Sequence, residues 1–200
     1  MSHDGNRSYA AGMRQVANNF FSILFRNKFK VIIAILIFFF YLNQTKTASA
    51  IFFVIALIAI ASVSTIYKYN IKLSFGFELV TMSTVLATIV YGPLVGAFVG
   101  LISSVLAEFL PQMIEASSIF WICSVTFSAF LVAIFFSLGI KSLLVLGLIS
   151  FAFQMIISEP IRLLGPIEVR LQGMLYVVTG LVWNIFVFTK IAPLILNIMT

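Results

Sequence analysis

Long uninterrupted runs of apolar residues, separated by short polar or Gly/Pro-containing breaks, follow the first thirty residues of the chain. The runs are continuous rather than alternating, and only helices and closed barrels satisfy the backbone hydrogen bonds in lipid. They therefore predict membrane helices, since roughly 20 residues cross the hydrocarbon core of a bilayer. Six runs approach or reach this length, and they are Ile51–Tyr67, Phe75–Tyr91, Leu94–Leu110, Ile119–Leu138, Ser142–Ile157 and Met174–Met199.

The N-terminal region differs from this pattern. Residues 1–30 are polar and basic, and their second half mixes Phe, Ile and Leu with cations, as in a helix that lies at a membrane interface. The run Val31–Leu42 covers only about 18 Å of a core that is roughly 30 Å thick. We predict an all-α integral membrane protein, with a cytosolic tail and interfacial segment over 1–30 and a single transmembrane domain over 31–200. That domain is a compact bundle of six core helices plus an extra N-terminal apolar or interfacial helix.

The distribution of charge gives two alternative topologies. If Val31–Leu42 spans the bilayer, a cytosolic N-terminus leaves only Lys46 and Lys141 outside, which fits the positive-inside rule. If it lies in the interface, every later loop changes sides. The charge bias favours the first topology, which places four later basic residues inside: Lys68, Lys72, Arg162 and Arg170.

Composition excludes several classes of protein. The chain is 62% hydrophobic and 9% charged, whereas soluble domains are roughly 45–50% apolar and about 25% charged. A soluble enzyme, a secreted disulfide scaffold and a disordered chain are therefore excluded. The net charge of +6 is concentrated near the N-terminus and suits anionic headgroups rather than nucleic acid. The basic N-terminus is typical of a prokaryotic plasma-membrane protein, and the single Cys123 is expected to be a small buried apolar residue.

Candidate chemistry is sparse. The single histidine, His3, lies in the tail, and the sequence has no paired carboxylate motif, nucleophile elbow or phosphate-binding glycine loop. We expect no enzymatic activity, no metal site and no cofactor. Four ionisable residues lie near predicted helix ends, where their charges are expected to reach the membrane interface at a small cost in free energy. They are Lys72, Glu78, Glu108 and Glu115.

Small residues recur every fourth position after the tight turn predicted at the Gly-Pro pair. Pro93 is tolerated there because a first-turn proline loses no helical hydrogen bond. Residues four apart share one helical face, and small residues allow another helix to approach closely. That helix belongs either to the same chain or to another subunit. The face consists of Gly92, Gly96, Gly100 and Ser104, and Glu108 continues it.

Polar groups in the C-terminal half offer further candidates. The stretch 158–173 is interpreted either as a connecting loop or as the wall of a binding site, and its prolines are expected to break any long helix. Glu159 and Arg162 can pair if a helical turn forms. Asn184 needs a hydrogen-bond partner on another helix or a ligand, and Gln154 is a further polar residue that can contribute to the same cavity.

The run SFGFELVTMSTVLATIVYGPLVGAFVGLISS resembles the substrate-binding S components of energy-coupling-factor (ECF) transporters. The likeness extends over residues 71–110, and GLVWNIFVFTKIAPLI near the C-terminus resembles the last helix of that family more weakly. The resemblance implies a six-helix bundle that captures a vitamin, a vitamin precursor or a metal ion from outside. It also implies a membrane coupling subunit and two ABC ATPases as partners. By this analogy the substrate-binding candidates are Glu159, Arg162, Trp183 and Asn184.

Two other functions stay open. One is a non-transporting, MreD-like membrane scaffold that organises partner proteins through its glycine face and basic N-terminus. The other is a lipid-handling membrane protein, for which the sequence offers no catalytic group. Ligand binding distinguishes the transporter subunit from the scaffold, since a scaffold needs no solute pocket.

Overall fold

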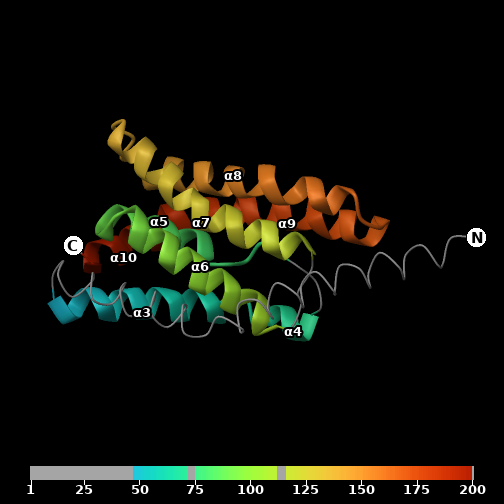
Figure 1. Ribbon diagram of the computed structural model, residues 1–200, viewed down its shortest axis with the longest axis horizontal. Coiled ribbons are helices and arrows are strands. Elements are labelled where there is room, and N and C mark those ends of the chain that lie inside the picture. The colour runs from blue at the N-terminus through green and yellow to red at the C-terminus, as the bar shows by residue number, and fades with distance from the viewer. Residues whose placement is uncertain (1–46, 72–74, 112–115, 200) are drawn as a thin grey trace, which may run out of the picture.

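The computed structural model describes residues 47–71, 75–111 and 116–199, and each regular element within these ranges is a helix (Figure 1). The predicted tail, the interfacial segment and the run Val31–Leu42 lie outside the described residues. The helices, in chain order, are α3 (Thr47–Val63), α4 (Tyr67–Ile71), α5 (Val80–Tyr91), α6 (Pro93–Phe109), α7 (Ala116–Ser137), α8 (Leu143–Leu163), α9 (Ile167–Phe186), the π-helix η1 (Val187–Ile191) and α10 (Ala192–Met199).

The helices have the composition of a membrane protein. Four segments are long and apolar enough to cross a membrane: Ala50–Tyr69, Ser117–Ser137, Leu143–Leu163 and Ile167–Met199. Helices α5 and α6 are apolar but shorter. The prediction of an all-helical fold is thus confirmed for the described residues, and the four long apolar segments are consistent with a membrane bundle. The crossing of the bilayer by α5 and α6 stays a prediction.

Successive long helices run in alternating directions along the long axis of the molecule (Figure 1). The C-terminal ends of α4, α6 and α8 therefore gather at one end of the bundle with the N-terminal ends of α7 and α9. We call this the α4 end. The α5–α6 turn and the α7–α8 connection lie at the opposite end (Figure 1).

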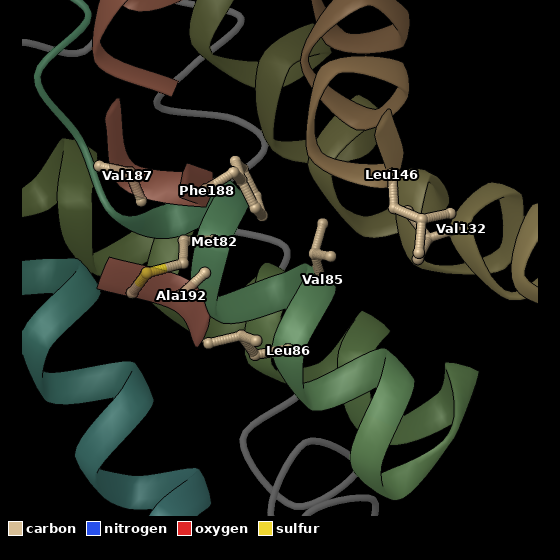
Figure 2. Packing of buried hydrophobic residues seen from close by; sticks show 8 residues of the cluster. All are labelled: Met82, Val85, Leu86, Val132, Leu146, Val187, Phe188 and Ala192. Atoms are coloured by element: carbon tan, nitrogen blue, oxygen red, sulfur yellow. The ribbon is translucent and has the colours of Figure 1, made fainter. Parts of the chain in front are cut away.

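Helix α5 is the central element. It contacts α3, α6, α7, α8 and α10, and residues Val80 to Thr88 are all buried. Two of its hydroxyl groups bond within the helix, since Thr84 donates to the Val80 carbonyl (2.9 Å) and Thr88 donates to the Thr84 carbonyl (2.7 Å). Figure 2 shows the main apolar core around it, formed by Met82, Val85, Leu86, Val132, Leu146, Val187, Phe188 and Ala192.

Three predicted helix boundaries are wrong. The helix predicted over Phe75–Tyr91 begins only at Val80, because the main chain before it bonds to side chains of α9. Helices α8 and α9 also extend far into the predicted polar loop, ending at Leu163 and beginning at Ile167. The expectation that Pro160 breaks the helix is wrong, since Pro160 lies inside the last turn of α8.

The outer surface is rich in large apolar side chains, among them Phe52, Phe127 and Ile156. Exposed apolar surface on this scale is unsuited to water and suits contact with lipid. Cys123 lies on this surface. The prediction that it is buried is therefore wrong, because its position on α7 faces outward.

Candidate functional site: a buried polar cluster

Charged and polar side chains from several helices converge in the part of the bundle nearest the α4 end. They come from the helices α4 to α9 and from the connection before α5, and they are linked by ion pairs, hydrogen bonds and ring contacts. We call them the polar cluster: Lys68, Glu78, Thr81, Glu108, Ser117, Ser118, Gln154, Glu159, Arg162 and Tyr176.

Lys68 and Glu108 form a buried ion pair within this cluster. The Lys68 Nζ lies 3.6 Å from the Glu108 Oε1, and the Ser118 hydroxyl donates to the Glu108 Oε2 at 2.5 Å. Lys68 is 5% exposed and Glu108 is 8% exposed. The expectation that Glu108 reaches the interface is wrong, because Glu108 continues the inward face of α6. Its charge is instead compensated by pairing, as a buried charge requires.

Glu78 is buried without a compensating ion pair among the described residues. Its side chain is nearly inaccessible, with the whole residue 2% exposed. The Oε1 accepts a hydrogen bond from the Thr81 hydroxyl at 2.9 Å, whereas the Oε2 has no hydrogen-bond partner in the described ranges. Glu78 was also expected to reach the interface, and its burial overturns that expectation. An unpartnered buried carboxylate oxygen is costly and therefore unusual.

A chain of polar contacts leads from Glu78 into the bundle. The Thr81 hydroxyl also lies 3.1 Å from the Gln154 Oε1, and its one proton can serve only one of its two neighbours at a time. The Gln154 Nε2 donates to Ser150 (3.2 Å), which donates to Ser128 (2.9 Å). Gln154 thus belongs to the same polar region, as the sequence predicted.

Glu159 and Arg162 form the second ion pair, which confirms their predicted pairing. The Arg162 Nη1 lies 2.8 Å from the Glu159 Oε1, and the Arg162 Nε donates to the Ser117 hydroxyl at 3.3 Å. The guanidinium carbon lies 4.9 Å from the centre of the Tyr176 ring, within the range of a cation–π contact. Gly173 leaves room for this pair, because a Cβ there would lie 2.6 Å from the Glu159 Oε2.

The connecting segment, residues 75–79, is held against α9. The Gly76 N–H donates to the Thr179 hydroxyl (2.9 Å), and the Trp183 Nε1 donates to the Glu78 carbonyl (2.9 Å). The Tyr67 hydroxyl also donates to the Phe75 carbonyl. This segment therefore positions Glu78, because both its backbone and its neighbours are fixed by the adjacent helices.

The predicted binding residues thus lie in three settings. Glu159 and Arg162 pair within the polar cluster, and Trp183 binds the backbone of Glu78. Asn184, the next residue of α9 after Trp183, is buried. Its side-chain amide donates to the Gly180 carbonyl of the same helix at 2.8 Å. The hydrogen bond observed for Asn184 therefore lies within α9, and a contact with a ligand stays a prediction.

The glycine face of α6 packs inside the molecule. A Cβ at Gly96 would lie 2.9 Å from the Thr88 Cα, and one at Gly100 would lie 2.9 Å from the Thr84 Oγ1, both on α5. Ser104 is fully buried and bonds to its own helix. Of the two predicted neighbours, the helix of the same chain is the one observed. Gly92 has a different role, since its φ of 94° forms the turn and Pro93 then begins α6.

Sequence reasoning missed Lys68 and Ser118 as members of one site. The Ser-Ser pair at the start of α7 and the hydroxyl-rich sequence of α5 are the signals that could have indicated polar partners inside the bundle. No group of three or more His, Cys, Asp or Glu suited to a metal ion occurs in the part of the chain that the structure describes. No protein-family model, curated protein or solved structure matches this chain.

Proposed function

We propose that this chain is the substrate-binding subunit of a membrane importer. The observation that carries the proposal is Glu78, a buried carboxylate with an unpartnered oxygen inside a cluster of charged side chains from several helices. One ionisable group in a membrane helix costs about 2.5–3.5 kcal/mol on insertion scales. Four of the five such groups in this part of the bundle pair with each other, and a polar solute that binds among them would account for the fifth, Glu78.

The resemblance over residues 71–110 to ECF S components supports the finer proposal of an ECF-type importer. The bound solute is then a vitamin, a vitamin precursor or a similar small molecule. A membrane coupling subunit and two ABC ATPases supply the energy, and the complex resides in a prokaryotic plasma membrane. Four span-length helices support the membrane location.

The geometry favours this function over the scaffold. A scaffold was expected to recruit partners through the glycine face of α6, and that face packs against α5 within the chain. A scaffold also needs no buried carboxylate with an unpartnered oxygen. The alternative keeps the apolar outer surface and the basic N-terminus, which lies outside the described residues, as means of holding partners.

Mass spectrometry of protein purified gently from native membranes tests the proposal, since it identifies both co-purifying polypeptides and released small molecules. We expect an ABC ATPase pair, a second membrane subunit and a solute in near-stoichiometric amount. Thr81→Val should release less solute, because the hydroxyl between Glu78 and Gln154 is lost. Thr189→Val is the matched control, since Thr189 is exposed and bonds only within its own helix. Protein that carries only lipid, with envelope or cytoskeletal partners, would contradict the proposal.

A further inference from the structure

The charges of the polar cluster do not balance among the described residues. Lys68 pairs with Glu108 and Arg162 pairs with Glu159, whereas Glu78 lacks an ion pair. Among the described residues the cluster thus holds three carboxylates and two cations, and Lys68, which pairs with Glu108, also lies within electrostatic range of Glu78. In a low-dielectric interior an uncompensated charge attracts a positive group strongly.

Aromatic rings belong to or pack against the segment that carries Glu78, and Phe77 lies on its exposed side. Phe75 and Phe77 stack with their centroids 5.6 Å apart, and Phe77 meets Trp183 edge-on at 5.5 Å. Tyr67 lies 6.4 Å from both phenylalanine rings and within electrostatic range of the Glu78 carboxylate. The negative faces of aromatic rings attract cations.

An aromatic ring already contacts two cations within the polar cluster. The Tyr176 ring receives the Arg162 guanidinium at 4.9 Å and the Lys68 ammonium at 5.9 Å. It also lies within electrostatic range of Glu78. Carboxylate and aromatic groups together form the chemistry that recognises ammonium groups.

We infer that the site takes an organic cation, a solute with a protonated or quaternary amine that lies against the Glu78 Oε2 and the neighbouring aromatic rings. This inference rests on the proposed function and adds the chemical class of the substrate. An anionic solute would meet the uncompensated carboxylate. A divalent metal ion would need further carboxylate, histidine or cysteine ligands, and the described residues provide no such group.

Binding of choline to the purified protein tests the inference, with thermal unfolding as the readout. The matched probe is the uncharged carbon isostere of choline, in which a tert-butyl group replaces the trimethylammonium. We expect millimolar choline to raise the unfolding midpoint saturably, since a ligand that binds the folded state stabilises it, and we expect the isostere to have no effect. Equal effects of the two probes, or no effect of choline, would overturn the inference without any variant.

Glu78→Gln identifies the residue responsible. It keeps an oxygen to accept the Thr81 bond and removes the charge, so we expect half-saturation at an approximately tenfold or higher choline concentration. Glu168→Gln is the control, since Glu168 is exposed on α9 and the change in net charge is the same. Equal choline binding by the wild type and Glu78→Gln would also overturn the inference.

The solute released from native membranes separates this inference from the proposed function. A neutral or anionic solute in stoichiometric amount would overturn the inference of a cationic substrate. It would leave the proposed function as a substrate-binding subunit unaffected. A released solute that carries a cationic nitrogen, and that is lost from Glu78→Gln, would support both. The absence of any solute would overturn the proposed function itself.

Discussion

The docking of the connecting segment on α9 leads to a sharp prediction for Gly76→Ala. A Cβ at this position would overlap the Gly180 backbone and would lie 2.7 Å from the Tyr176 carbonyl oxygen. Backbone atoms cannot rotate away, so the segment must move off α9. Overpacking typically costs about 1–3 kcal/mol, and the bonds of Gly76 to Thr179 and of Trp183 to the segment contribute about 1 kcal/mol each.

We therefore expect Gly76→Ala to lower the free energy of unfolding by about 3–5 kcal/mol. The assay is reversible unfolding in mixed micelles with increasing SDS, followed by tryptophan fluorescence. Gly165→Ala is the control, because its Cβ would lie 3.1 Å from the Arg162 carbonyl oxygen and 3.2 Å from a Val169 methyl, so its cost should stay below about 1 kcal/mol. Equal stability of the two variants would show that the segment is not held against α9.

Three further changes test other contacts. Glu108→Gln should destabilise the protein by about 3 kcal/mol because Lys68 is left buried and unpaired. Adding Lys68→Met in a double-mutant cycle should restore much of the lost stability, and strict additivity of the two changes would refute the pairing. Gly96→Leu should prevent folding because a Cβ would lie 2.9 Å from the Thr88 Cα, so monodisperse protein at wild-type yield on size-exclusion chromatography would contradict internal packing. Trp183→Phe should cost about 1 kcal/mol in the same SDS titration through the lost indole bond, and an unchanged midpoint would show that this bond contributes nothing.

The positions of the long helices could be predicted from the sequence. The run Ile119–Leu138 corresponds closely to α7 (Ala116–Ser137), and Leu94–Leu110 corresponds to α6 (Pro93–Phe109). An apolar run of this length has few alternatives in lipid, and the Gly-Pro pair marks a turn by its own chemistry. Local sequence is sufficient because each helix satisfies its backbone hydrogen bonds internally.

The candidate site could be predicted only in part. The Glu159–Arg162 pair is local, three residues apart on one helix, and its spacing was enough. The pair of Lys68 with Glu108 joins residues that are distant in the chain, and hydrophobic runs do not show which faces of two helices meet. The burial of Glu78 depends on the non-helical connecting segment before α5. The sequence does not reveal this segment, because its residues continue without a break into the apolar run of α5.

The π-helix Val187–Ile191 affects how the chain tolerates insertions. In a regular α-helix, positions four apart rotate by about 40° at each step, yet Tyr176, Gly180, Asn184, Phe188 and Ala192 are all buried. The wider π turn, with its i→i+5 bonds, compensates for part of this rotation and returns Ala192 to the core. Deletion of one residue here would yield an unbroken α-helix in which Ala192 still faces the core, whereas the full sequence wound as a regular α-helix would turn Ala192 away from it. The phase of the C-terminal helix is thus set by a single extra residue.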